Sequence, residues 1–75
     1  MELTKYKHID IDHEMLGGQP YVKGTRLSVA FILSCLSQGM RIEEISETYV
    51  RVTSEEVSEV LKFAAEVLDA WPVAA

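Results

Sequence analysis

Apolar residues after position 28 recur at the three- and four-residue spacing that marks one face of a helix. This spacing predicts a first helix over residues 28–38, with Ser28 as its N-cap and Gly39 at a left-handed C-terminal position. A shorter second helix is expected over residues 42–48. A third is expected over residues 54–70, because Thr53-Ser54-Glu55-Glu56 matches a capping box and Pro72 marks a stop.

The residues before position 28 follow the pattern of strands and turns. The run His8-Ile9-Asp10-Ile11-Asp12 alternates polar and apolar side chains, Gly17-Gly18 is typical of a turn, and Gln19 to Lys23 suits a second short strand. We therefore expect one domain over residues 1–75, in which short strands and turns over 7–26 precede a three-helix bundle over 28–70. This is a mainly α fold, and its second and third helices have the order of a helix-turn-helix.

The third helix carries more apolar surface than one small core requires. On a helical wheel its apolar arc is roughly 220° wide, about twice the width usual for a surface helix. We expect the core stripe to consist of Val57, Leu61, Ala64, Ala65 and Leu68. The flank beside that stripe consists of Val60, Phe63, Val67, Ala70 and Trp71.

The apolar flank has two explanations. The N-terminal strands can cover it within the same chain. Alternatively, Val60, Phe63, Val67 and Trp71 form the interface of a twofold homodimer. We favour the dimer, because a 75-residue core gives a thin stability margin and the single cysteine excludes an intrachain disulfide.

The charges are divided unevenly along the chain, whose net charge is −5. Residues 1–41 carry five Lys and Arg against four Asp and Glu, and residues 42–75 carry two against eight. A polyanion would be repelled by the second half, which weighs against simple nucleic-acid binding. The expected contacts to a partner or to phosphate are the cations Lys5, Lys7, Lys23, Arg26 and Arg51.

No combination of residues indicates catalysis. His8, Asp10 and Asp12 would share one strand face and suit a metal, but this alternation is more typical of a solvated edge strand. Cys35 lies between apolar helix residues and is expected to be a small buried hydrophobe. We therefore expect no enzymatic activity, no metal and no cofactor. A cytoplasmic location is expected, because neither a signal peptide nor an apolar run of membrane-spanning length is present.

The run Gly17-Gly18-Gln19-Pro20-Tyr21-Val22-Lys23-Gly24-Thr25-Arg26-Leu27, followed at a distance by Glu44-Ile45 and Tyr49, forms a specific motif. It resembles the bacterial "domain of unknown function 433" family, with the pattern GG-x-P-x-V-K-GTR-L, over residues 8–68. The resemblance implies a homeodomain-like or winged three-helix fold. It also implies a dimeric antitoxin of a toxin–antitoxin pair, which holds a PIN-like nuclease inactive and binds its own promoter. One departure is Val50, where the family commonly has proline after the tyrosine.

A nuclease of this kind holds metal with clustered acidic residues, so an inserted cation would suit its site. Arg26 and Lys23 are the candidates, with Arg51 as a third. The expectation is therefore a non-enzymatic antitoxin-like module, and the alternative is a stand-alone helix-turn-helix regulator that binds DNA without a toxin partner.

Overall fold

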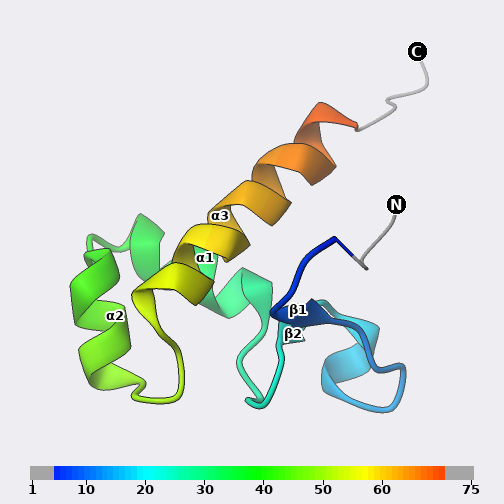
Figure 1. Ribbon diagram of the computed structural model, residues 1–75, viewed down its shortest axis with the longest axis horizontal. Helices are drawn as coiled ribbons and strands as arrows, with labels where there is room; N and C mark the ends of the chain where they lie inside the picture. The colour runs from blue at the N-terminus through cyan, green and yellow to red at the C-terminus, as the bar shows by residue number, and fades with distance from the viewer. Residues whose placement is uncertain (1–4, 71–75) are drawn as a thin grey trace.

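A computed structural model describes residues 5–70 of the chain, which form three helices preceded by a small two-stranded sheet (Figure 1). The elements in chain order are strand β1 (Ile9–Asp10), the short 3-10 turn η1 (Leu16–Gly18), strand β2 (Tyr21–Val22), and helices α1 (Val29–Ser37), α2 (Ile42–Thr48) and α3 (Ser54–Asp69). The mainly α architecture expected from the sequence is confirmed. No helix in this part of the chain is long and apolar enough to cross a membrane.

The helix boundaries are fixed by the capping residues that the sequence offers. Ser28 Oγ accepts a 2.9 Å hydrogen bond from the backbone N–H of Phe31 at the start of α1. Gly39 ends the same helix with a φ of 96°, a left-handed conformation that glycine adopts without a Cβ clash. At α3, Thr53 and Glu56 each accept a bond from the other's backbone N–H, at 3.1 and 2.9 Å. This reciprocal pair is the expected capping box.

The two strands are shorter than expected but pair in the expected region. They run antiparallel, with Ile9 opposite Val22 and Asp10 opposite Tyr21. The side chains of Ile9 and Val22 are almost completely buried, so this one pair anchors the sheet to the helices. The sheet thereby fixes the loop that leads from β2 into α1.

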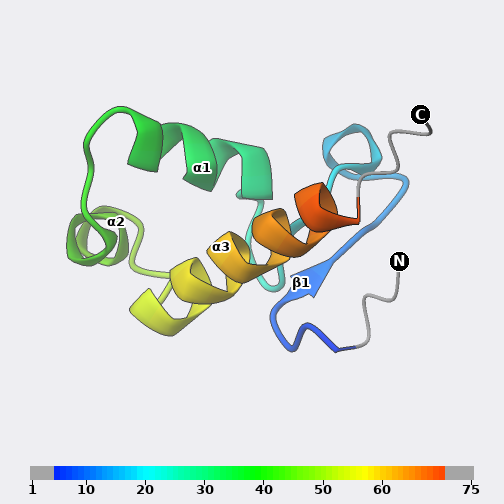
Figure 2. The same cartoon turned by 90° about the horizontal axis from the view of Figure 1, so that it is seen from above.

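The core lies where α3 crosses the other two helices and the N-terminal segment. Figure 2 shows α1 beside α3, α2 near the first turns of α3, and β1 on the opposite side of α3 from α1. The residues buried between these elements are Tyr6, Ile9, Val22, Val29, Ile32, Cys35, Ile45, Val52, Val57, Val60 and Phe63. Cys35 is therefore a buried core residue, as predicted.

The buried face of α3 differs from the predicted one. Val57, Val60 and Phe63 are the buried residues of the helix, whereas Leu61, Ala65 and Leu68 are exposed. At about 100° per residue, the buried face is rotated by about 80° from the expected core stripe. The prediction that Leu61, Ala65 and Leu68 belong to the core is therefore wrong.

The N-terminal segment explains this rotation. Tyr6 is only 3% exposed and packs edge-to-face against Phe63, with ring centroids 5.1 Å apart. Val60 and Phe63 are consequently core residues of their own chain, and the prediction that they form an exposed dimer interface is wrong. Val67 is half-buried, and Trp71 lies outside the described residues.

A polar cluster between the N-terminal segment and α3 was also not predicted. Glu59 accepts hydrogen bonds from the backbone N–H of His8, at 2.7 Å, and interacts with its Nδ1 at 2.9 Å. Glu66 accepts a bond from the Tyr6 hydroxyl and lies 3.3 Å from Lys5 Nζ. His8 was expected on a solvated strand face, and that prediction is wrong because the segment lies along this side of α3.

Candidate partner-binding site

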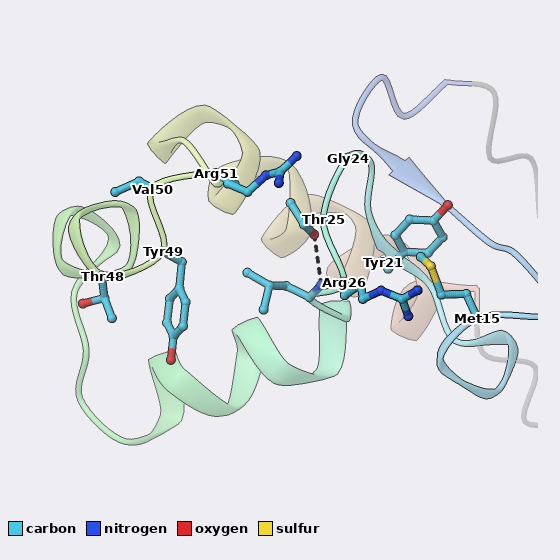
Figure 3. A pocket seen from close by; sticks show the side chains of 10 residues that line it. Met15, Tyr21, Gly24, Thr25, Arg26, Thr48, Tyr49, Val50 and Arg51 are labelled. Atoms are coloured by element: carbon cyan, nitrogen blue, oxygen red, sulfur yellow. Dashed lines mark hydrogen bonds between the residues drawn. The ribbon is translucent and has the colours of Figure 1, made fainter.

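An open pocket of about 770 Å³ lies between the loop that follows β2 and the turn that joins α2 to α3 (Figure 3). We call it the basic pocket, because Arg26 and Arg51 both line it. Its full lining is Met15, Tyr21, Gly24, Thr25, Arg26, Leu27, Thr48, Tyr49, Val50 and Arg51. Segments about 25 residues apart in the sequence therefore contribute one arginine each to the same hollow.

The loop that carries Arg26 is closed by its own hydrogen bonds. Thr25 Oγ1 donates to the carbonyl of Val22 at 2.8 Å and accepts from the backbone N–H of Leu27 at 3.0 Å. The Val22 N–H in turn donates to the Leu27 carbonyl at 3.0 Å. Gly24 has a φ of 81°, which a residue with a side chain adopts only with strain. The Gly-Thr sequence thus sets the direction in which Arg26 leaves the loop.

The turn that carries Arg51 is anchored on both sides of that residue. Val52 is 1% exposed, and its backbone N–H donates to the Tyr49 carbonyl at 2.9 Å. The Tyr49 ring packs edge-to-face against Phe31 of α1, with centroids 5.4 Å apart. Arg51 is therefore an exposed side chain on a turn whose neighbours are fixed.

The charge of the basic pocket is uncompensated within the described chain. None of the ten lining residues is acidic, and neither Arg26 nor Arg51 forms an ion pair with any of residues 5–70. In Figure 3, Arg51 extends toward Gly24 and Thr25, whereas Arg26 extends toward Tyr21 and Met15. The two guanidinium groups thus lie on separate sides of the hollow, each with free donors.

Tyr21 lines the pocket together with Arg26. Burial raises the pKa of its hydroxyl, and the negative charges of Asp10 and Asp12 raise it further. The hydroxyl therefore stays protonated at neutral pH and is available as a hydrogen-bond donor. A carboxylate or phosphate group beside either guanidinium group would meet charged hydrogen-bond donors.

The basic pocket offers guanidinium and hydroxyl groups from its lining residues. Its lining contains no histidine, cysteine or serine. No group of three or more His, Cys, Asp or Glu residues suited to a metal occurs within residues 5–70. Arginine keeps its charge at every physiological pH and presents a planar fork of donors to oxyanions.

The other predicted cations lie elsewhere. Lys5 is paired with Glu66 and lies over the Tyr6 ring, 5.4 Å from its centroid. Lys7 and Lys23 are exposed and do not line the basic pocket. Of the five predicted contacts, the fold therefore brings together Arg26 and Arg51 only.

Tyr21, Tyr49 and Met15 were not predicted as pocket residues. Nothing in the local sequence connects them, because they meet only when the α2–α3 turn packs beside the β2–α1 loop. The Gly24-Thr25-Arg26 run that follows β2 was the usable signal, since it identified Arg26 and the loop that holds it.

A comparison with family models matches residues 9–64 to the family described as "Protein of unknown function (DUF433)". The match covers more than half of the chain. The chain belongs to the DUF433 family. Comparisons with curated proteins and with solved structures gave no match. Both arginines of the basic pocket lie inside the segment that defines membership of DUF433.

Proposed function

We propose that this chain is a non-enzymatic binding module of the cytoplasm, which acts as the antitoxin of a PIN-type nuclease. The basic pocket holds an acidic group of the nuclease. One observation supports this most strongly: Arg26 and Arg51, from separate segments, line a pocket that contains no acidic residue.

The pocket chemistry agrees with an acidic protein partner. Hydrogen bonds from arginine to a carboxylate are charge-assisted and about twice as strong as neutral ones. Leu27, Val50 and Met15 add apolar surface beside the arginines, and Val50 is 82% exposed. A partner that presents a carboxylate next to an apolar side chain would meet both kinds of surface.

The test is inhibition of the nuclease encoded by the neighbouring gene. Arg26→Ala and Arg51→Ala should each weaken inhibition by about tenfold or more, because each removes a charge-assisted hydrogen bond. Lys23→Ala is the matched control, since it removes one exposed positive charge from the same loop without touching the pocket. Full inhibition by the Arg26→Ala, Arg51→Ala double variant would exclude the pocket from the mechanism.

DNA binding without a toxin is the second candidate, and the observation that favours it is the order α2, turn, α3 with Arg51 in the turn. The first turns of α3 oppose it, because Glu55 is exposed and would face phosphates. Retention of promoter DNA that falls steeply with salt, together with no effect on the nuclease, would favour this candidate over the first.

A further inference from the structure

Helix α3 carries an apolar stripe that the core leaves uncovered. Leu61 is 40% exposed and Leu68 is 69% exposed, and both lie on one face with Ala64 and Ala65 between them. We call these four residues the α3 stripe. Leu61 and Leu68 are a heptad apart, which separates them by about 10.5 Å along the helix.

The α3 stripe adjoins an apolar groove of about 280 Å³ between α1 and α3. Ala64 and Leu68 belong to both, and Ala30 and Leu33 of α1 form the opposite wall of the groove with Pro20. The stripe and groove therefore make one continuous apolar surface, on the side of α3 away from the N-terminal segment.

The α3 stripe is symmetric about its own centre. Leu61 and Leu68 lie equally far on either side of the midpoint between Ala64 and Ala65. An antiparallel copy of the helix, related by a twofold axis through this midpoint, would place each Leu61 against Leu68 of the second copy. The two alanines at the centre permit the close approach of two helices.

The charges beside the α3 stripe have the same symmetry. Lys62 and Asp69 are exposed on one flank, and neither forms an ion pair with another residue of 5–70. In the antiparallel arrangement, Lys62 would lie within about 3 Å, along the axis, of Asp69 of the second copy. The twofold axis makes two such pairs.

We propose that a second copy of this chain covers the α3 stripe, as an antiparallel α3–α3 pair with its twofold axis between Ala64 and Ala65. This interface is independent of the basic pocket. It also differs from the interface expected from the sequence, because it uses the exposed edge of α3 and not the Val60–Phe63 flank.

Sedimentation equilibrium and light scattering test the proposal on the full chain. The chain should be a dimer at micromolar concentration. Leu68→Glu and Leu61→Glu should each weaken the dimer by about 100-fold or more, because each places an unpaired charge in an apolar interface. Val50→Glu is the matched control: it changes an exposed apolar residue outside α3 and should leave the dimer intact.

Charge exchange tests the antiparallel register. Lys62→Glu and Asp69→Lys should each weaken the dimer by about twofold to tenfold, because each replaces two attractive pairs with repulsive ones. The double variant restores opposite charges and should restore the dimer. If the dimer of the double variant is no stronger than the dimer of either single variant, the antiparallel register is wrong.

Cross-linking locates the axis. The Ala65→Cys variant is made in a Cys35→Ala background. Position 65 of one chain would lie next to position 65 of the second copy, so this variant should form a covalent dimer on oxidation. Leu61→Cys alone should not, because the two copies of residue 61 would lie about 10 Å apart along the axis. A mixture of Leu61→Cys and Leu68→Cys chains should cross-link to each other.

Three results would overturn the proposal. One is a chain that is monomeric at high micromolar concentration, and another is a dimer that withstands both glutamate substitutions. The third is a monomer in which Leu68→Glu increases quenching of the single tryptophan, Trp71, since that result would assign the α3 stripe to the chain's own residues 71–75. In each case, Arg26→Ala and Arg51→Ala would still test the basic pocket, because neither residue lies on α3.

Discussion

The carboxylate of Glu59 accepts a hydrogen bond from the backbone N–H of His8 at 2.7 Å and lies 2.9 Å from the imidazole Nδ1 of the same residue. The two residues are 51 positions apart in the sequence. The second imidazole nitrogen of His8 lies 3.9 Å from Glu56, one turn earlier on α3. All three side chains are half-buried. This cluster joins the segment before β1 to the last helix.

Glu59→Ala should lower the free energy of unfolding by about 1–3 kcal/mol, because it leaves the His8 N–H without an acceptor in a half-buried position. Urea denaturation followed by circular dichroism measures the change. Glu47→Ala is the control, since Glu47 is an exposed glutamate on α2. Equal stabilities of the two variants would mean that the His8–Glu59 contact contributes nothing.

The contribution of Glu59 should depend on pH. Burial alone would raise the pKa of Glu59, but the hydrogen bonds and charge of His8, with the charge of Lys62, lower it below its usual 4.5 in the folded protein. As the pH falls below 4.5, the unfolded chain takes up this proton first, so the stabilisation decreases and is lost below the folded pKa. The stability difference between the natural chain and Glu59→Ala should therefore shrink between pH 5 and pH 3.

Phe63→Ala should cost about 3–5 kcal/mol of unfolding free energy, because it removes a buried ring that packs against Tyr6. Val50→Ala, at an exposed apolar position, should change stability by no more than about 0.5 kcal/mol. Thermal and urea unfolding of the two variants provide the comparison. A cost below about 1 kcal/mol for Phe63→Ala would contradict its place in the core.

Gly24→Ala should destabilise the loop that carries Arg26. A Cβ at Gly24 meets no atom within 4 Å, so the cost comes from the left-handed φ of 81° alone and is about 1–2 kcal/mol. Partner binding through the basic pocket should weaken as well, because Arg26 leaves this loop. The neighbouring exposed substitution Lys23→Ala should leave both stability and binding unchanged, and hydrogen exchange over residues 22–27 would report the loosened loop.

The helices were predictable because each is bounded by residues that act locally. Ser28, Gly39 and the Thr53–Glu56 pair fix the ends of α1 and α3 through contacts within four positions of sequence. Arg26 was recognisable as a candidate contact residue for the same reason, since the Gly-Thr turn before it is a local structure.

The rotation of α3 was not predictable from its own sequence. A helix with apolar residues around roughly 220° can bury either edge of that arc, and the choice depends on what else packs there. Tyr6 and His8 decide it here, because they bring a ring and a hydrogen-bond donor to the Phe63 and Glu59 side. That Arg26 and Arg51 line the same pocket could not be predicted for the same reason, because it depends on tertiary packing.

The bond from the Tyr6 hydroxyl to Glu66 spans 60 positions of sequence. A chain emerging from the ribosome can form α1 and α2 early, but it cannot form this bond until residue 66 is free of the exit tunnel. Folding of this domain is therefore completed only after residue 66 has been synthesised, and a stalled or shortened product that lacks α3 would leave Tyr6 and Ile9 exposed to chaperones and proteases.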